Sequence, residues 1–556
     1  MGPTEESLFS FERLLDGRIA SSPVWKLPLR SALSALFLFV DGLVHRGDIE
    51  GAASVVSGIS LLCPFLQRCS PEIGVSAEDA LSVVGDHEVE LLRQAAVYAR
   101  FCQLMPEVRQ GYYNVKAVKR GFRLAYKEQE YRRSEGYDFI LHEVGKATDS
   151  SSLEMHSILF SQLVRQWPMW DLRVVNAAFD QLYAHHRQRI YEPPLLRLDA
   201  YQSAFGFTRD EFNSVRAALF ALASFSNGMH LSAAKERDQS GDPRVIQKYQ
   251  AKFLEWNTPI LTKAFVYSCL IRTTALPKSK IETVLSYFVL DAAAGDFDNA
   301  GDGYFPPLIL FQDSILFNPH VVRLMTHERN LLYVTNKRHR DHFNNIVSRH
   351  LEPKLLDDAL TEFSRVPNWL VKRNVRWGRG KIDLLAFDPR SNAVLQLQAK
   401  AAIPAQNARM TRQLEDHALR AITQLQKLEQ LGNTGLSRLC SRVFQRRMTN
   451  PSLISGILSR SGLGTWRSWS TLGGVIPLNV PLLRETLKVM AQEPTSPLTM
   501  FPQTAMNLLN SWSHRVVRGW QQPKIELMGK SIHFPRIKTD ERELSKLIIE
   551  LGIFDR

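Results

Sequence analysis

The spacing of apolar residues changes near residue 300, and this change restricts the possible folds more than any other sequence feature. Before about residue 290, apolar residues recur at intervals of three and four, which places them on one face of a helix. Leu33, Leu36, Phe37 and Val40 are an example. After about residue 305, short apolar runs typical of strands appear, such as Leu308–Phe311 and Leu331–Thr335. The pattern predicts a mostly α-helical N-terminal region followed by an α/β or α+β part.

The change in spacing coincides with a turn-rich segment at Ala292–Pro307, where Gly, Asp and Pro residues cluster. A chain of 556 residues is long enough for two to four domains of roughly 100–200 residues each. We therefore expect a helical region at 1–300, an α/β domain at 301–500 and a helical C-terminal extension at 501–556. Within the first region, Lys116–Arg133 is predicted to be a basic helical segment.

Charge is distributed unevenly along the chain. Residues 1–300 contain 33 Lys or Arg against 35 Asp or Glu, a net charge of −2, whereas residues 301–556 contain 36 against 21, a net charge of +15. The whole basic excess therefore lies in the C-terminal part. Such an excess is typical of a domain that binds a polyanion, and nucleic acid is the leading candidate partner. A basic surface that serves only solubility is the alternative.

Several classes of protein are disfavoured by what the sequence lacks. Its five cysteines are scattered, with no CxxC pair and no His/Cys cluster at the spacing of a zinc site. The N-terminus has no signal-peptide pattern, and the longest apolar stretch is shorter than the roughly 20 residues that span a bilayer. We therefore expect a cytoplasmic protein without a membrane partner. The motifs GxSxG, GxxxxGK[ST] and HExxH are absent from the sequence.

The segment Asn374–Lys400 carries the most informative polar residues. Two apolar runs flank a turn at residues 389–392, which predicts a β-hairpin. If the turn is centred between residues 390 and 391, Asp383 faces Gln398 across the hairpin. Lys400 lies two residues beyond Gln398 and so shares its face. An acid, an amide and an amine are thus predicted to meet at one edge of an otherwise apolar strand pair.

This combination suits metal-dependent cleavage of a phosphodiester bond. Asp383 and Gln398 offer oxygen ligands to a hard cation, and Lys400 can orient the attacking water or offset developing charge. Gly380-Lys381-Ile382-Asp383 followed by Gln398-Ala399-Lys400 resembles the core motif of the PD-(D/E)XK nuclease superfamily, in the Gln-x-Lys form of its Mrr-like and nuclease-related members. The resemblance covers about residues 340–490.

The resemblance implies a restriction-endonuclease-like fold with a central mixed sheet flanked by helices, and a nuclease that uses Mg²⁺ or Mn²⁺ on DNA. It also implies one further acidic ligand from the helix before the strands, and Glu352 matches that position. Pro353 departs from the pattern of a regular helix, so Asp357, Asp358 and Glu362 remain alternatives. By analogy, such an architecture suits bacterial restriction or antiviral defence.

A second group of residues is predicted to contact nucleic acid. A long amphipathic helix at about 405–431 carries a basic and amide stripe beside its apolar face, and this stripe can contact backbone phosphates. Gln413 and Gln424 are also secondary candidates for the metal site. The candidate nucleic-acid-binding residues are Arg376, Arg379, Lys381, Arg409, Gln413, Arg420, Gln424 and Lys427.

Two other functions remain open. The chain could be a nucleic-acid-binding module on an inactive nuclease-like core, because Gln398 replaces an acidic ligand. It could instead be a helical scaffold whose basic part contacts an acidic protein. If the chain is a nuclease, the helical region is a candidate sensor, partner-binding or regulatory module, and a homo-oligomer is compatible with cutting both strands.

Overall fold

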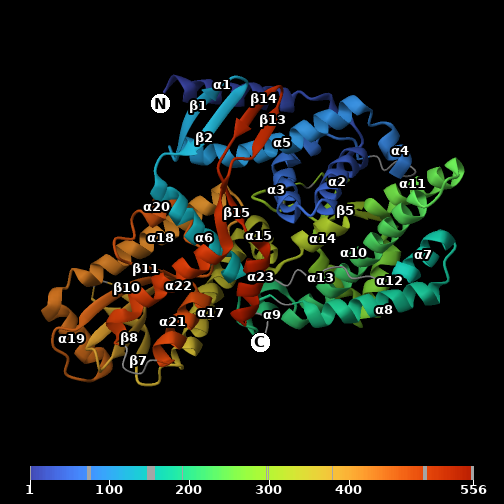
Figure 1. Cartoon of the computed structure of the whole chain (residues 1–556). Helices are drawn as coiled ribbons and strands as arrows, with labels where there is room; N and C mark the ends of the chain where they lie inside the picture. Colours follow the sequence, from blue (N-terminus) through green and yellow to red (C-terminus); the bar gives the residue numbers. More distant parts are fainter. Residues whose placement is uncertain are drawn as a thin grey trace.

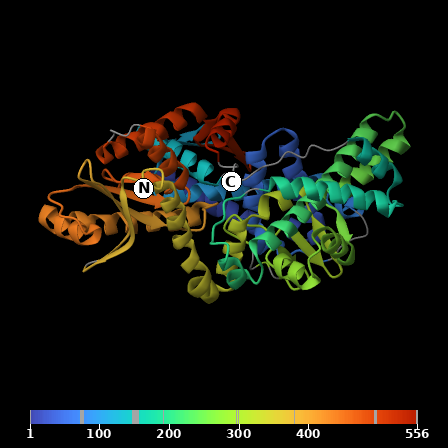
Figure 2. The same cartoon turned by 90° about the horizontal axis from the view of Figure 1, so that it is seen from below.

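The computed structural model describes residues 2–71, 77–146, 157–190, 192–295, 297, 300–378, 380–492 and 497–552. The chain is mostly helical, and its described strands form four sheets. Figures 1 and 2 show an elongated molecule with the orange C-terminal domain at one end and the green helices of the middle of the chain at the other. No helix in the described ranges has the length and apolar character needed to cross a membrane.

The N-terminal helices share one hydrophobic core, in which Phe37 and Phe101 are almost fully buried. Their apolar residues follow the predicted helical spacing. The helices are α1 (Pro3–Ala20), α2 (Leu29–His45), α3 (Ile49–Leu66), α4 (Ala77–Ser82) and α5 (Asp86–Arg109).

The predicted basic helix at Lys116–Arg133 is wrong for its first half, which forms a β-hairpin. β1 (Tyr113–Val118) pairs antiparallel with β2 (Gly121–Tyr126), and α6 (Gln129–Lys146) begins only afterwards. In β2, Phe122 and Leu124 are buried and Arg123 is exposed. The basic residues therefore lie on the solvent face of a strand. The alternation of buried and exposed residues extends over only a few positions, so the many basic residues suggested a charged helix instead.

The C-terminal extension contains strands that join this hairpin, so the purely helical extension predicted for 501–556 is wrong. β14 pairs in parallel with β2 to give the strand order β1-β2-β14-β13, as Figure 1 shows near the top of the molecule. β14 thus pairs with a strand from the other end of the chain, and the local sequence does not indicate so distant a partner. The elements are α22 (Phe501–Val516), β12 (Val517–Gln521), β13 (Lys524–Leu527), β14 (Lys530–His533), β15 (Arg536–Thr539) and α23 (Glu541–Glu550).

A second group of helices packs around α10 (Arg209–Asp238), which is buried on nearly every side. α10 begins with a capping box in which the Thr208 hydroxyl accepts a hydrogen bond from the Glu211 amide and the Glu211 carboxylate accepts one from the Thr208 amide. The helices around it are α7 (Ser157–Gln166), α8 (Leu172–Arg189), α11 (Pro243–Asn257), α12 (Lys263–Thr274) and α13 (Lys278–Leu285).

The boundary predicted at residue 300 falls inside one sheet. Strands on either side of it hydrogen-bond in the order β3-β6-β5-β4, so the strands before and after residue 300 belong to one sheet. Leu308–Phe311 forms the predicted strand, but Leu331–Thr335 lies in a helix, because a short buried apolar run fits both structures. The elements are β3 (Ile260–Thr262), β4 (Val289–Asp291), β5 (Leu308–Phe311), β6 (Ser314–Phe317), α14 (Pro319–Met325) and α15 (Glu328–Arg338).

The α/β domain has a five-stranded mixed sheet in the order β11-β10-β9-β8-β7. β8 runs antiparallel to β7 and β9, and β10 runs parallel to β9 and β11. Its strands are β7 (Leu370–Trp377), β8 (Gly380–Asp388), β9 (Ala393–Lys400), β10 (Ser452–Ser459) and β11 (Ile476–Leu478).

Helices cover both faces of this sheet. Leu385 packs in a core with Leu436 of α19, whereas Leu384 packs in a core with Leu355 of α17. The alternation follows from the period-two geometry of a strand. The helices are α17 (Ser348–Phe363), α18 (Ala408–Glu429), α19 (Gly432–Phe444), α20 (Trp466–Trp469) and α21 (Val480–Gln492).

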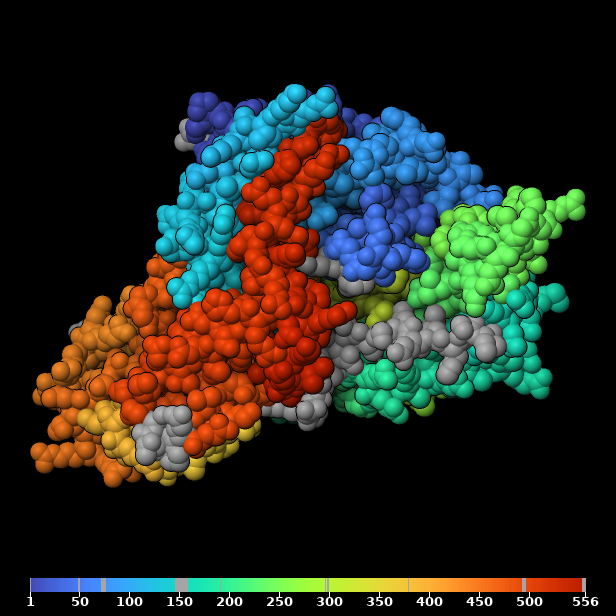
Figure 3. Space-filling view, viewed as in Figure 1, coloured from blue at the N-terminus to red at the C-terminus, as the bar shows by residue number. Residues whose placement is uncertain are grey.

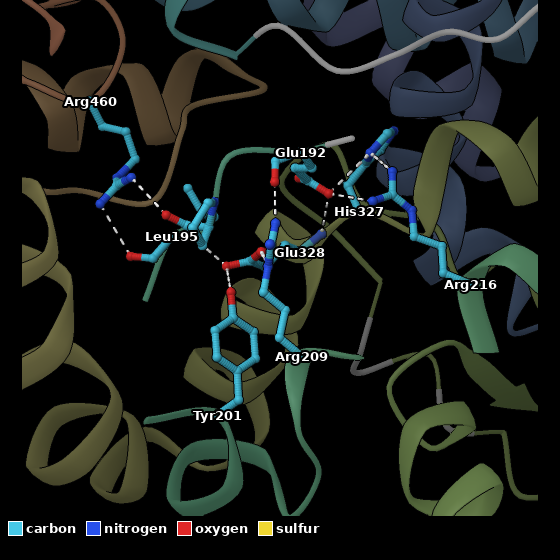
Figure 4. A network of polar contacts seen from close by, with 9 residues as sticks. Glu192, Leu195, Tyr201, Arg209, Arg216, His327, Glu328 and Arg460 are labelled. Atoms are coloured by element: carbon cyan, nitrogen blue, oxygen red, sulfur yellow. Dashed lines mark hydrogen bonds and ion pairs between the residues drawn. The ribbon is translucent and has the colours of Figure 1, made fainter. Parts of the chain in front are cut away.

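A buried network of charges holds the helical region together (Figure 4). The Arg216 guanidinium donates to Glu192 Oε2 at 2.6 Å and contacts His327 Nδ1 at 2.7 Å. The Glu328 amide also donates to Glu192 Oε2, at 3.2 Å. Burial alone would raise the pKa of Glu192, but the charge of Arg216 and the hydrogen bonds outweigh it and lower that pKa.

The same network reaches the α/β domain. The Glu328 carboxylate accepts hydrogen bonds from the Leu195 amide at 2.5 Å and from the Tyr201 hydroxyl of α9 (Ala200–Phe205). Arg460, which follows β10, donates to the Leu195 carbonyl at 3.2 Å and to the Leu351 carbonyl at 3.5 Å. The hydrogen bond from Arg460 to Leu195 therefore joins the α/β domain to this network.

His186 makes the stability of the helical region depend on pH. Its ring is buried on α8 and its Nε2 lies 2.7 Å from Ser224 Oγ. Burial, aided by nearby positive charges, lowers the pKa of His186 from 6.5 to about 3, so the folded protein holds it neutral. The neutral His186 ring therefore costs the folded protein no stability above about pH 6.5. Below that pH the free energy of unfolding decreases as the pH falls towards the folded-state pKa of His186.

We expect acidification from pH 7 to pH 4.5 to lower the free energy of unfolding by about 2 kcal/mol more in the wild type than in His186→Asn. Urea unfolding at the two pH values measures the difference, and His87→Asn on α5 is an exposed control. Equal acid sensitivity of the wild type and His186→Asn would contradict this assignment.

Candidate active site

The predicted hairpin forms with the predicted register. β8 ends at Asp388, opposite Ala393 of β9, and Leu384 pairs with Leu397. The Gln398 side-chain amide donates to Asp383 Oδ2, which also accepts the Ala399 amide at 2.9 Å. The Asp383 side chain is only 1% exposed. A carboxylate this deeply buried requires partners, and the hairpin supplies two of them.

Lys381 joins the two acids of the predicted site. Its Nζ lies 3.0 Å from Asp383 Oδ1 and 3.1 Å from Glu352 Oε1, so β8 and α17 are linked through one ammonium group. Burial opposes the charged form of Lys381, but hydrogen bonds to Asp383 and Glu352 outweigh it and raise its pKa. This role was missed from the sequence, where Lys381 was predicted to contact nucleic acid.

Lys400 lies on the same face at the end of β9. Its Nζ donates to Gln424 Oε1 of α18 at 2.9 Å. Burial lowers the pKa of Lys400, the negative charges of Asp383 and Glu352 partly oppose this, and Arg420 and Lys381 reinforce it. The hydrogen bond to Gln424 holds the amine at the end of β9. A lysine with a lowered pKa releases its proton more readily, which suits a group that activates water.

The other acids of α17 are engaged elsewhere. Asp357 binds Arg197 at 2.6 Å and Arg373 at 2.9 Å. Asp358 is paired with Lys354, and Glu362 is paired with Arg365 at 2.8 Å. Pro353 lies inside the helix without ending it, and a π-helical turn at Phe343–Val347 precedes it. Glu352 is the α17 acid that the structure brings next to Lys381 and Asp383.

The predicted nucleic-acid-binding residues are mostly exposed. Arg376 of β7 and Gln413, Arg420, Gln424 and Lys427 of α18 face solvent. Gln424 also reaches Lys400, so it links the stripe to the site. Arg409 differs because it is paired with Asp302 at 3.5 Å, on a loop of the helical region. Arg379 lies outside the described residues.

The two carboxylates and the amide suit a hard divalent cation. Glu352 and Asp383 already direct oxygens at one cation, the Lys381 ammonium, and Gln398 can turn its amide to offer an oxygen. Mg²⁺ is commonly held by one or two carboxylates together with water and substrate phosphate. Within the described residues, no group of three or more His, Cys, Asp or Glu side chains is arranged to hold a metal ion. The site is therefore a two-carboxylate candidate.

Comparison of the chain with protein families, with curated protein sequences and with solved structures finds no match.

Proposed function

We propose that the chain is a divalent-metal-dependent nuclease of the PD-(D/E)XK type that hydrolyses phosphodiester bonds in DNA. The observation that carries the proposal is that Lys381 contacts both Glu352 and Asp383 and that Gln398 contacts Asp383, with Lys400 two residues further along β9. The order of helix, three antiparallel strands, two helices and a parallel strand supports a restriction-endonuclease-like core.

Each residue has a distinct role in this proposal. Glu352, Asp383 and Gln398 would hold Mg²⁺ or Mn²⁺, which when bound supplies a positive charge beside the scissile phosphate. Lys400 would orient the attacking water and accept its proton, because burial lowers its pKa and it follows the ligand Gln398 by two residues on β9. Gln424 holds the Lys400 amine in place through its side-chain oxygen.

A basic surface beside the site supports nucleic acid as the substrate. Arg420 and Lys427 are exposed on α18, and Arg438 and Arg442 are exposed on the adjacent α19. Exposed guanidinium and ammonium groups on neighbouring helices can bind successive backbone phosphates. In this proposal the helical region is a sensor or protein-binding module of a defence nuclease that acts alone or as a homo-oligomer.

Cleavage by the purified full chain tests the proposal. Linear, circular and single-stranded DNA, with RNA alongside, are incubated with Mg²⁺ or Mn²⁺ and with EDTA. We expect cutting of DNA that EDTA abolishes and that Asp383→Ala lacks. If the wild type binds DNA but neither metal supports cutting, the nuclease proposal fails.

One observation favours a second candidate, a nucleic-acid-binding module without catalysis. The Lys381 ammonium satisfies both Glu352 and Asp383, so these acids have a partner without any metal. DNA affinity that falls steeply with salt, in a protein that binds no Mn²⁺, would support this candidate.

The two candidates differ in the expected effect of Lys381→Met. If the acids are metal ligands, removing the competing ammonium raises the affinity for Mn²⁺ by about tenfold, because a positive charge leaves the site. Titration calorimetry without nucleic acid measures this, and Lys372→Met on the exposed face of β7 is the matched control. Unchanged Mn²⁺ affinity in Lys381→Met would contradict the assignment of Glu352 and Asp383 as ligands.

A further inference from the structure

A large cavity lies away from the candidate active site, where the three parts of the chain meet. Its volume is about 980 Å³, and its walls come from α3, α5, α10, α14 and the C-terminal strands. Figure 3 shows this place as a recess in which yellow residues lie between the blue surface of α3 and the red C-terminal segment. Pockets for small molecules typically measure about 300–1,000 Å³, so the cavity can hold a ligand of nucleotide size.

Three arginines from separate elements line this cavity. Arg100 comes from α5, Arg323 from α14 and Arg536 from β15, and each side chain is partly exposed. His320, also on the wall, adds no charge near neutral pH, because burial and the nearby Arg323 lower its pKa to about 3. The planar guanidinium group binds phosphate and carboxylate through paired hydrogen bonds. The wall is therefore suited to an anion.

The character of the wall changes along α5. Arg100, Gln103 and Glu107 all face the cavity, and the seven residue steps from Arg100 to Glu107 correspond to about 10 Å along a helix. Glu107 accepts a hydrogen bond from the Tyr113 hydroxyl at 2.5 Å, and burial raises the pKa of Glu107. Glu135 lines the same end, and burial and the neighbouring Glu107 raise its pKa. This end offers hydrogen-bonding groups with reduced negative charge.

A second cavity of about 270 Å³ continues from this end and shares Glu107 and Glu135 with the first. Tyr112 and Tyr131 line it. Tyrosine rings and hydroxyls can pack on a flat base or bind polar ring atoms. The two cavities together provide an arginine end and an aromatic, hydrogen-bonding end.

We propose that this cavity is a nucleotide-binding site, in which the arginines hold the phosphates and the Glu107–Glu135 end holds the hydroxyl or amino groups of the nucleoside. Ala405 and Gln406 also line the cavity and belong to the segment that follows Lys400. A bound nucleotide therefore contacts the helical region, the C-terminal strands and the α/β domain together. It stabilises their junction whether or not the chain is a nuclease.

Binding of ATP to the full chain, with EDTA present and without nucleic acid, tests the site. Calorimetry should show one ATP per chain and the thermal midpoint should rise, because a ligand that binds only the folded state stabilises it. Adenosine and inorganic triphosphate should each bind at least about tenfold more weakly than ATP. Adenosine lacks the phosphates that the arginines hold, and triphosphate lacks the nucleoside. Triphosphate that binds as tightly as ATP would overturn the nucleotide assignment.

Variants locate the site. Arg100→Gln and Arg323→Gln should each weaken ATP binding by about tenfold or more. Arg13→Gln, on the exposed face of α1, is the matched control and should bind as the wild type does, and so should Lys400→Ala. If one arginine variant does not fold, the other is sufficient. No ATP binding at millimolar concentration, or equal binding by the arginine variants, would overturn the proposal.

Discussion

Replacing Lys400 by alanine is expected to reduce the rate of metal-dependent DNA cleavage by about 10²–10⁴-fold, the range associated with a positioned general acid or base. DNA binding should change little, because Lys400 is only partly exposed, whereas Arg420 and Lys427 are exposed and remain available to backbone phosphates. Cleavage rates and DNA affinity measured in the same buffer separate the two effects.

Two further variants test this assignment. Lys400→Arg keeps the positive charge but cannot accept a proton near neutral pH, so it should remain slow if Lys400 acts as a base. Lys488→Ala, on the exposed side of α21, is the control for loss of a lysine from the same domain. If Lys400→Ala cuts DNA at the wild-type rate, Lys400 has no catalytic role.

Replacing Arg216 by methionine is expected to lower the free energy of unfolding by about 3–5 kcal/mol, because Glu192 then remains charged and buried without its main partner. Both side chains are buried, at 1% and 8% exposure. Urea unfolding followed by tryptophan fluorescence measures the loss.

The double variant Glu192→Gln/Arg216→Met should be more stable than Arg216→Met alone, because the uncompensated charge is removed. Arg272→Met, which breaks the exposed pair with Asp180, is the control and should cost less than about 1 kcal/mol. A similar loss of unfolding free energy in Arg216→Met and Arg272→Met would show that the buried Arg216–Glu192 pair contributes no more to stability than an exposed pair does.

The local sequence pattern was sufficient to predict the structure where the residues in contact are close in sequence. The hairpin register followed from the turn at 389–392, which placed Asp383 opposite Gln398. The helices of the first 290 residues followed from apolar spacing, since each buries one face or, like α10, nearly all of its surface. Turn geometry and side-chain periodicity are local properties, so one sequence is enough to predict them.

The local sequence pattern gave wrong predictions where the contacting segments are distant in sequence or where one pattern fits two structures. The hairpin at 113–126 and the strand pair at 524–533 complete one sheet only together, so neither was recognised. The domain boundary at residue 300 was wrong because β4 pairs with β5 across it. Lys381 was assigned to nucleic acid because its two acidic partners come from different elements.

The sequence by itself therefore determined the helical character of the first region, the strand register and the face shared by Asp383, Gln398 and Lys400. Only the tertiary structure decided that Glu352, rather than the other acids of α17, reaches Lys381. It also decided that β1 and β2 share a sheet with the C-terminal β13 and β14, and it placed three arginines around one cavity. The physical reason is that periodicity and turns act over a few residues, whereas ion pairs, sheets and cavities depend on packing between distant segments.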